Sequence, residues 1–282
     1  MSAPPDPSSE PDHVRGQDQS GDDIGSIGWL GDALGAAQFL TRVPIHTSRA
    51  AGRAAIVPWF PVVGALVGLV VAGVAVGLDA LIAPFPAAAT AVMVGVIVTG
   101  AFHEDGLADS ADAIAGGTTR ERRYEILADS RLGTYGTAAV CGTILVRVST
   151  VATLVVVGGP ATVGAVVAAH ALARGAGVSL MAAVEPVREA KGLGQSFGNL
   201  VSTRRATGTV VVAVVIAVVA VGWWAAPMLV AAGLAALLVA RLARTSFGGV
   251  NGDHLGAAEQ LAEIAGLLTA CALAVQHPIW WG

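Results

Sequence analysis

Long apolar segments recur along most of this chain, and they restrict its fold more than any other feature. A helix needs about 20 residues to cross the ~30 Å hydrocarbon core of a membrane. The chain is 54% hydrophobic and 13% charged, whereas soluble domains carry about 25% charged residues. The pattern predicts an all-α, polytopic integral membrane bundle of about six to seven transmembrane helices. The expected spans, of which the last is the weakest, are 56–78, 87–102, 134–157, 160–182, 209–225, 227–243 and 261–277.

Charged residues divide the connections between these segments into two groups. The short connections, 79–86, 158–160 and 224–227, contain Asp79 as their only charged residue. The long connections all carry Arg or Lys, and an even number of spans separates each from the next. The positive-inside rule places such loops in the cytoplasm, which predicts a multi-pass protein of the inner (cytoplasmic) membrane with its active site facing the cytoplasm. The basic residues are Arg42, Arg49, Arg53, Arg120, Arg122, Arg123, Arg131, Arg188, Lys191, Arg204, Arg205, Arg241 and Arg244.

The N-terminal segment differs from the membrane domain expected for residues 26–282. Residues 1–25 are rich in Pro, Ser, Asp and Gly and lack an apolar stretch. Such a composition is typical of a disordered tail and not of a secretory signal. The apolar spacing over residues 27–40 then predicts an interfacial helix. The net charge of −4 and the lack of a basic tract predict no nucleic-acid partner.

Residues 100–117, GAFHEDGLADSADAIAGG, contain the acidic pattern on which the functional prediction depends. Asp105, Asp109 and Asp112 follow i, i+4, i+7 spacing, which puts them within about 60° of one another on a helix. Carboxylates on one face repel unless they are protonated or bridged by a cation. No Lys or Arg at helical spacing neutralises them, so the pattern indicates a Mg²⁺ site open to substrate phosphates. The alternative is a solvated acidic face at a helix start, where the helix dipole also favours aspartate.

His103 and Glu104 precede these aspartates at the expected membrane boundary. An imidazole exchanges protons near neutral pH, so His103 is a candidate general base for a hydroxyl nucleophile. Glu104 is a candidate base or a further metal ligand. The alternative for both is a polar boundary residue that is hydrogen-bonded to the backbone.

Two later loops carry residues suited to phosphate binding. In Asp129-Ser130-Arg131-Leu132-Gly133, an acid and a guanidinium beside glycine could bind a metal and a phosphate together, which makes Asp129 a candidate metal ligand and Arg131 a candidate phosphate ligand. Arg188 and Lys191 precede a Gly-Leu-Gly turn and are candidate anion ligands.

The last polar loop and two intramembrane arginines complete the candidate residues. Asp253 lies in a Gly-rich turn before a helix, on the same predicted face of the membrane as the other acids. Arg147 and Arg174 lie within apolar runs, where a charge is costly and usually faces the bundle interior. Arg174 follows His170 by four residues, so both share a helix face. Either this pair lines a substrate cavity, or the arginine reaches the headgroups.

Five motifs in this order resemble the cobalamin synthase family, the adenosylcobinamide-GDP ribazoletransferases. They are FLTRVP at 39–44, FPVVGALVG at 60–68, HEDGLADSADA at 103–113, DSRLGTYG at 129–136 and GGVNGDHLGAAEQLAE at 248–263. The resemblance runs from about residue 29 to 270. It departs at Ala113, where glycine is more common, and at Asn251, where threonine is usual.

The resemblance implies a membrane enzyme that joins adenosylcobinamide-GDP to α-ribazole, or to its 5′-phosphate, with release of GMP. Mg²⁺ is then the expected cofactor, and membrane lipid is a partner; the sequence leaves homo-oligomer formation open. Asp105, Asp109, Asp112 and Asp129 are expected to bind the metal, with Asp253 beside the substrate. Arg131, Arg188 and Lys191 are expected to hold phosphate oxygens, and His103 or Glu104 to accept the proton.

Two other functions compete with this interpretation. A CDP-alcohol phosphotransferase also uses clustered aspartates, but its full pattern has an Ala-Arg pair that is missing after Asp112. A cation-coupled transporter would place acids at mid-span and repeat its topology internally, whereas these acids lie at a membrane boundary.

Overall fold

The structure is a computed structural model that describes residues 28–45, 47, 54–187 and 201–276, so the predicted tail at 1–25 lies outside it. Within the described residues all regular structure is helical, apart from one isolated β-bridge between Pro186 and Val250, which confirms the all-α prediction. The helices are α1 (Gly28–Leu40), η1 (Ala54–Trp59), α2 (Phe60–Asp79), α3 (Pro84–Thr99), α4 (Phe102–Gly116), α5 (Arg120–Leu127), α6 (Thr134–Val157), α7 (Gly159–Ala183), α9 (Thr203–Val221), η2 (Gly222–Trp224), α10 (Ala225–Phe247) and α11 (Gly252–Ala274).

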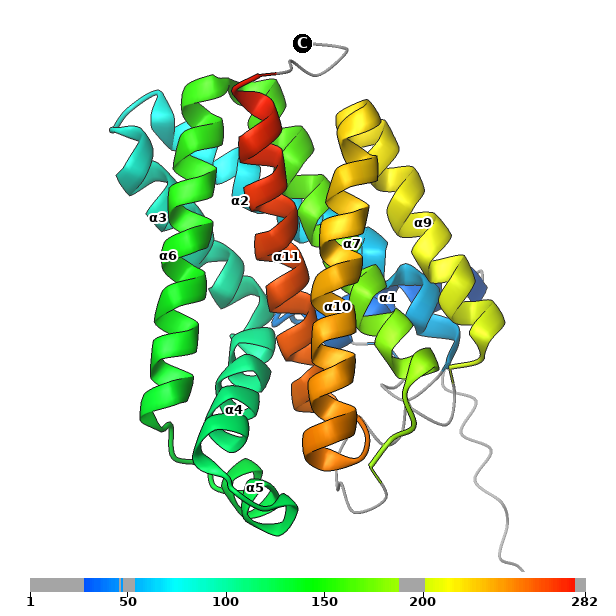
Figure 1. Cartoon of the computed structure of the whole chain (residues 1–282). Coiled ribbons are helices and arrows are strands. Elements are labelled where there is room, and N and C mark those ends of the chain that lie inside the picture. The colour runs from blue at the N-terminus through cyan, green and yellow to red at the C-terminus, as the bar shows by residue number, and fades with distance from the viewer. Residues whose placement is uncertain (1–27, 46, 48–53, 188–200, 277–282) are drawn as a thin grey trace, which may run out of the picture.

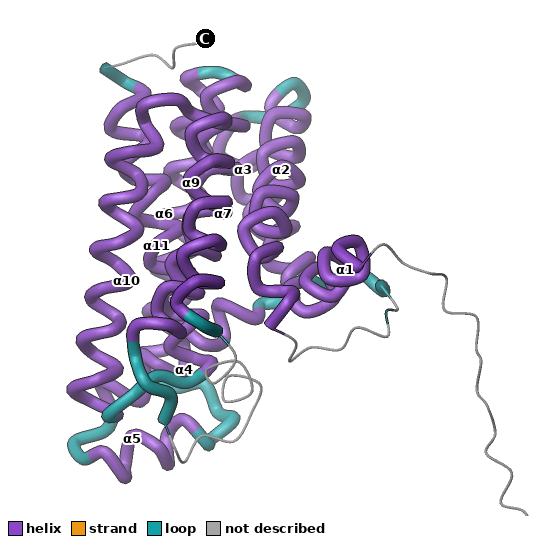
Figure 2. Tube along the Cα trace, turned by 90° about the vertical axis from the view of Figure 1, so that its right-hand side faces the viewer, coloured by secondary structure: helices purple, strands orange, loops and turns teal. Residues whose placement is uncertain are grey.

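The long helices lie side by side as a bundle of antiparallel neighbours (Figures 1 and 2). In the described residues, five stretches are long and apolar enough to cross a membrane, and a sixth is obtained if α3 and α4 count as one bent span. One of the five, of 45 residues, comprises α9, η2 and α10, and Figure 1 shows it folded back on itself at η2. The predicted polytopic bundle is therefore confirmed.

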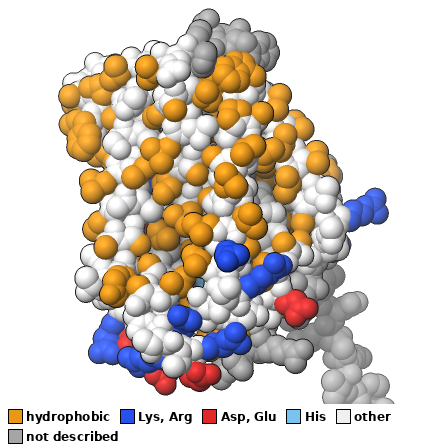
Figure 3. Space-filling view, viewed as in Figure 1, with side chains coloured by type: hydrophobic (Ala, Val, Ile, Leu, Met, Phe, Trp, Pro, Cys, Tyr) orange, Lys and Arg blue, Asp and Glu red, His pale blue; other side chains and the backbone are white. Residues whose placement is uncertain are grey.

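Charged side chains gather near one end of this bundle, which we call the polar end. The connections that follow α4, α5, α7 and α10 all lie there, at the bottom of Figure 1. On the face that Figure 3 shows, most of the coloured basic and acidic side chains lie near the same end. The prediction that the long charged connections share one end of the molecule is thus confirmed for the described part of the chain.

The predicted span 87–102 ends earlier than expected because the chain bends sharply at its polar end. Gly100 and Ala101 have φ values of 68° and 58°, in the left-handed region that stops a helix. Helix α4 leaves α3 at 90° and lies at the polar end beside the lower parts of α6 and α11 (Figure 1). Because α4 carries four acidic residues, we treat it as lying outside the membrane spans.

Two other boundaries differ from the predicted ones. The weak segment expected at 261–277 belongs to a full-length helix, α11, which starts at Gly252. Acidic residues of α11 pair with buried cationic side chains, so the helix keeps its full length although its sequence is less apolar than that of the other spans. Arg241 and Arg244, expected in a loop, lie in the last turns of α10, where a positive charge suits the negative end of the helix dipole.

Helix α1 confirms the helix predicted at 27–40 and lies across the side of the bundle (Figure 2). Trp29 stacks on Trp59 of η1 with ring centroids 6.0 Å apart, and Phe39 stacks on Phe60 of α2 at 5.6 Å. Trp29 keeps 55% of its surface exposed. An exposed aromatic residue on such a helix is typical of the membrane–water interface.

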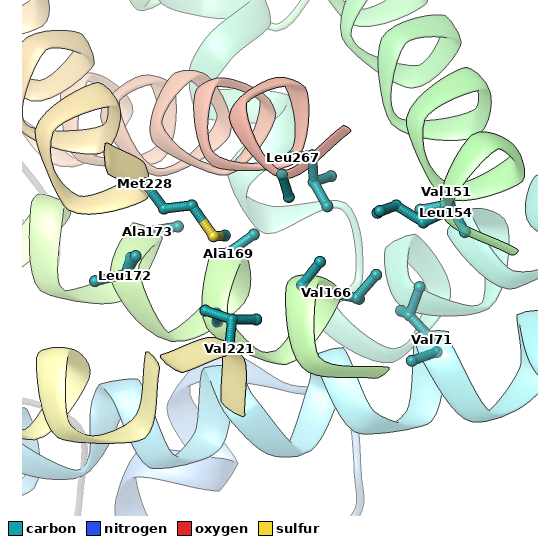
Figure 4. Close-up of a cluster of buried hydrophobic side chains, with 14 of the residues drawn as sticks. Val71, Val151, Leu154, Val166, Ala169, Leu172, Ala173, Val221, Met228 and Leu267 are labelled. Atoms are coloured by element: carbon teal, nitrogen blue, oxygen red, sulfur yellow. The ribbon is translucent and has the colours of Figure 1, made fainter. Parts of the chain in front are cut away.

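Helix α7 forms the centre of the bundle, since 83% of its most apolar 18-residue stretch is buried. Figure 4 shows Val166, Ala169 and Leu172 of α7 among Met228 of α10 and Leu267 of α11. Small residues let the neighbouring backbones approach this helix closely. A Cβ atom at Gly64 of α2, for example, would lie 2.7 Å from the carbonyl oxygen of His170.

We expect Gly164→Ala to destabilise the bundle where α7 meets α9. The added methyl group would overlap the carbonyl oxygen of Ala220 and lie 3.1 Å from a side-chain carbon of Val221, and such overpacking costs about 1–3 kcal/mol. Thermal unfolding in detergent micelles would measure the loss. Gly233→Ala in α10 is the control, because nothing lies within 4 Å of its added carbon. Equal melting temperatures for the two variants would contradict the close α7–α9 contact.

Candidate functional site

The site is built where α4 crosses the start of α11, and two glycines make this crossing close. A Cβ atom at Gly106 would lie 2.8 Å from the carbonyl oxygen and 3.0 Å from the Cα atom of Asp253. A Cβ atom at Gly256 would lie 3.2 Å from the carbonyl oxygen of His103. The two backbones are therefore nearly in contact, which brings the acids of α4 next to Asp253.

Three carboxylates, those of Asp105, Asp109 and Asp253, form what we call the acidic cluster. Asp105 is exposed, and the other two are partly buried. Burial, followed by the charges of Asp105, Asp253 and Asp112, raises the pKa of Asp109 to about 6. A carboxyl group surrounded by other carboxylates is stabilised in its charged form by a bound cation. The repulsion among these carboxylates is the observation that favours a divalent ion here.

Asp253 is held in its place by the N-terminal cap of α11. The Asn251 side-chain oxygen accepts a hydrogen bond from the His254 backbone at 3.1 Å, and His254 Nδ1 accepts one from the Asn251 backbone at 3.1 Å. The Asn251 amide also donates to the Asp253 carboxylate at 2.8 Å. Asn251, the position that departs from the usual threonine, thus orients an acid of the cluster.

Asp112, predicted as a metal ligand, points instead to the start of α6. Its two carboxylate oxygens accept hydrogen bonds from the backbone N–H groups of Gly133 and Gly136, at 2.7 and 2.9 Å. A carboxylate at a helix N-terminus satisfies unpaired N–H groups and suits the helix dipole. Any Cβ atom at either glycine would overlap this carboxylate, so the glycines of the DSRLGTYG motif make room for Asp112.

Asp129 and Arg131 pair with each other at the surface. The carboxylate of Asp129 accepts hydrogen bonds from Arg131 Nε at 2.9 and 3.1 Å, and Arg131 remains 87% exposed. The Arg131 guanidinium lowers the pKa of Asp129 to about 2. Among the described residues, the hydrogen bonds and the ion pair of Asp129 are with Arg131 and not with the acidic cluster. The predicted anion ligands Arg188 and Lys191 lie outside the described residues.

His103 and Glu104, the predicted bases, face the bundle interior, where both are buried. The Nε2 atom of His103 lies 2.7 Å from the Glu259 carboxylate. Glu104 is 2.7 Å from Arg147. Both are therefore paired inside the bundle, away from the surface on which Asp105 and Asp109 lie.

These two residues belong to a larger set of buried charged and polar side chains, which we call the buried ion network. Arg147 also pairs with Glu263 at 2.8 Å, and Arg174 lies 3.3 Å from both Glu259 and Glu263. Both arginines are therefore buried and ion-paired inside the bundle and do not extend to the headgroups. The network joins four helices through these members: His103 and Glu104 of α4, Arg147 of α6, His170 and Arg174 of α7, and Glu259, Gln260 and Glu263 of α11.

Helix α5 lies at the polar end, where it is hydrogen-bonded to the end of α10. Arg123 donates to the carbonyl oxygen of Ser246 at 3.2 Å, and the Tyr124 hydroxyl donates to that of Phe247 at 2.6 Å. These bonds satisfy carbonyl groups at the end of α10 that have no partner within the helix. A polar pocket of about 400 Å³ lies next to this contact, and it is lined by Arg120, Glu121, Tyr124, Glu185, Pro186, Val187, Phe247 and Gly248.

The carboxylates of the acidic cluster are the right type of ligand for Mg²⁺, which prefers oxygen. Within the described residues, however, no three His, Cys, Asp or Glu side chains are gathered as a self-sufficient metal centre. Mg²⁺ is commonly held by one or two carboxylates together with substrate phosphates and water. The acidic cluster fits this second arrangement.

Comparison with known proteins assigns the chain to a family. The family model described as cobalamin-5-phosphate synthase matches residues 32–271. The chain belongs to this family. A Bradyrhizobium diazoefficiens protein named adenosylcobinamide-GDP ribazoletransferase is 40% identical over 86% of this chain and 94% of its own length. Relatives of the same name from Azorhizobium caulinodans and Escherichia coli are 36% and 34% identical, over 88% and 82% of this chain and 98% and 95% of their own. No solved structure matches the chain.

The close crossing of α4 and α11 in this member of the cobalamin-5-phosphate synthase family was not predicted from the sequence. The spacing of Asp105 and Asp109 on one helix was visible, but Gly106 between them gave no sign of a partner helix. Gly256 and Glu259, at i and i+3 on α11, were the matching signal. A glycine and an acid on one face of an apolar helix indicate a close crossing with a buried ion pair.

Proposed function

We propose that this chain transfers the adenosylcobinamide phosphoryl group from adenosylcobinamide-GDP to α-ribazole or its 5′-phosphate, releasing GMP. The observation that carries the proposal is the acidic cluster at the polar end of a bundle that belongs to the cobalamin-5-phosphate synthase family. The printed names of the relatives supply the substrate, and the cluster supplies groups suited to a diphosphate with a divalent ion.

One or two of the carboxylates of Asp105, Asp109 and Asp253 would hold Mg²⁺ together with the substrate phosphates in this proposal. When bound, the ion would neutralise the diphosphate and stabilise the charge on the departing GMP. Asp112 anchors the start of α6 to α4, the helix that carries Asp105 and Asp109. Arg131 lies in an exposed loop at the polar end and is a candidate phosphate ligand. To bind a substrate phosphate, it would have to give up its ion pair with Asp129.

The ribazole hydroxyl oxygen forms a bond to the phosphorus nearer the cobinamide, and the bond from that phosphorus to the bridging oxygen breaks. GMP leaves with that oxygen, and the hydroxyl proton passes to a base. Because His103 and Glu104 are buried and paired with Glu259 and Arg147, the proposal places this base within the acidic cluster. A carboxylate oxygen of the cluster that does not contact the ion would accept this proton.

We also propose that the polar end faces the cytoplasm in the inner membrane. The basic residues of α5 and of the last turn of α10 lie at this end, and positive charge is favoured on the cytoplasmic side. A cysteine-accessibility experiment with a membrane-impermeant reagent on inverted and right-side-out vesicles would test the orientation.

The activity test uses membranes that contain the full chain, incubated with adenosylcobinamide-GDP, α-ribazole and Mg²⁺. We expect GMP and a cobalamin product in equal amounts, and at least a 100-fold loss of both with excess chelator. A parallel incubation with a CDP-alcohol would release CMP only if the CDP-alcohol interpretation held. Uptake of the corrinoid into sealed vesicles without chemical change would instead favour transport, and undiminished product with chelator would remove Mg²⁺ from the proposal.

A further inference from the structure

The His103–Glu259 pair lies directly behind the acidic cluster. His103 is two positions before Asp105 on α4, and Glu259 is on the helix that carries Asp253. Their side chains are 2.7 Å apart and only 2% and 6% exposed. They are therefore too deeply buried to touch a substrate at the polar end, yet each is joined through a short stretch of helix to an acid of the cluster.

The charges of the buried ion network oppose a shift of α4 along α11. Glu104 pairs with Arg147 and accepts a 3.3 Å hydrogen bond from Gln260 of α11. Arg147 in turn pairs with Glu263 of α11. Any sliding or separation of the two helices would leave buried charges without partners, which is costly in a medium of low dielectric constant. The network therefore fixes the register of α4 relative to α11.

The Gly106–Gly256 crossing fixes the distance between the same two helices. The backbones approach until a Cβ atom at Gly106 would lie 3.0 Å from the Cα atom of Asp253, and one at Gly256 would lie 3.4 Å from the Cα atom of Gly106. No side chain separates the helices at this point. Register and distance are thus set by two independent features of the sequence.

We propose that His103 and Glu259, together with Gly106 and Gly256, are positioning residues that set the spacing of Asp105 and Asp109 relative to Asp253. This inference rests on the proposed function, because that spacing matters only if carboxylates of α4 and α11 bind an ion together with the substrate. Mg²⁺ demands a nearly ideal octahedral set of ligands, so a small change of spacing has a large effect on turnover.

The first part of the test measures the spacing without using activity. Cysteines are introduced by Asp109→Cys and Asp253→Cys in a full-length chain whose free thiols are removed by Cys141→Ser and Cys271→Ser. A short bis-methanethiosulfonate reagent should join the two helices rapidly. Adding Glu259→Gln, which keeps the side-chain volume but removes the charge, should slow cross-linking at least fivefold, and Gly106→Ala should do the same by steric separation. Gly142→Ala, with nothing within 4 Å of its added carbon, is the control and should leave the rate unchanged.

The second part measures turnover in chains that keep all their native cysteines and aspartates. Glu259→Gln and Gly106→Ala should lower kcat by about 100-fold with KM for adenosylcobinamide-GDP changed less than threefold, while Glu259→Asp should recover part of the loss. A purely stabilising role would lower the melting temperature and leave kcat of the folded fraction unchanged.

The inference is overturned if Glu259→Gln and Gly106→Ala both cross-link at the unmodified rate, or if kcat falls only in proportion to the unfolded fraction. Failure of the unsubstituted protein to form a corrinoid product would instead overturn the proposed function. The cross-linking result would still report whether these residues fix the helix spacing, so the two failures are distinguishable.

Discussion

Asp109→Asn should reduce the release of GMP by about 10²- to 10³-fold, the loss expected when one group that stabilises a transition state is removed. Asparagine keeps the shape of the side chain but loses its charge and one of its two anionic oxygens. Asp109 lies among Asp105, Asp253 and Asp112, whose charges act on it, so its removal weakens the binding of a cation by the whole cluster. The measurement is a steady-state assay of GMP and corrinoid product in detergent or vesicles.

Asp79→Asn is the matched control, because Asp79 is exposed at the end of α2 that is opposite the polar end (Figure 1). It should keep its full rate. Both variants should insert into the membrane and melt at similar temperatures, since in the described part of the chain Asp109 makes no hydrogen bond or ion pair to another segment. A rate for Asp109→Asn within twofold of the unsubstituted protein would remove this residue from the site.

Arg147→Met should destabilise the protein by about 3–5 kcal/mol, the usual cost of leaving the partners of a buried charge uncompensated. Methionine replaces most of the apolar volume of arginine but leaves Glu104 and Glu263 without the guanidinium, which lies 2.7 and 2.8 Å from them. Detergent unfolding monitored by circular dichroism, or the fraction of protein that survives heating, would measure the loss.

The same chain offers a control and a rescue for this prediction. Arg122→Met breaks an ion pair with Glu125 in which both side chains are at least 60% exposed, so it should change stability by less than about 1 kcal/mol. Adding Glu104→Gln and Glu263→Gln to Arg147→Met should recover at least half of the lost stability, because neutral amides tolerate burial better than charges. No recovery would show that Arg147 acts through packing and not through charge.

The spans were predictable because a membrane imposes one simple demand on each of them. Twenty or so apolar residues must follow one another, and the charged loops must share a side. That demand is local in the sequence, so the runs at 134–157 and 160–182 closely match α6 and α7. The bend after Thr99 was not predicted, because apolar residues continue past Gly100 and only the backbone conformation reveals the break.

The candidate site was predictable in part. Asp105, Asp109 and Asp253 were all named from the sequence, and the structure brings them together. Asp112 has the helical spacing of Asp105 and Asp109, but its carboxylate accepts hydrogen bonds from two backbone N–H groups of another segment. Periodicity reports which residues share a face, but it cannot report what that face meets.

The buried ion network was the least predictable part of the molecule. His103 and Glu104 have the chemistry of catalytic groups, and only contacts with α6 and α11 distinguish a paired charge from a free one. Arg147 and Arg174 were recognised as costly residues that needed an explanation. Two of their partners, Glu259 and Glu263, come from α11 and are visible in the sequence only as acids one turn apart.

The crossing of α4 with α11 has a consequence for how the molecule matures. A chain that emerges from the ribosome N-terminus first presents Asp105 and Asp109 early, while Asp253 belongs to the last helix of the described bundle. Before α11 is made, a copy therefore holds two of the three carboxylates of the acidic cluster. It also lacks Glu259 and Glu263, so Arg174 is without the two acids that pair with it here, and Arg147 has Glu104 but not Glu263. The arrival of α11 supplies the missing ion-pair partners and brings Asp253 to the acidic cluster, so the buried ion network and the candidate site are completed in the same step.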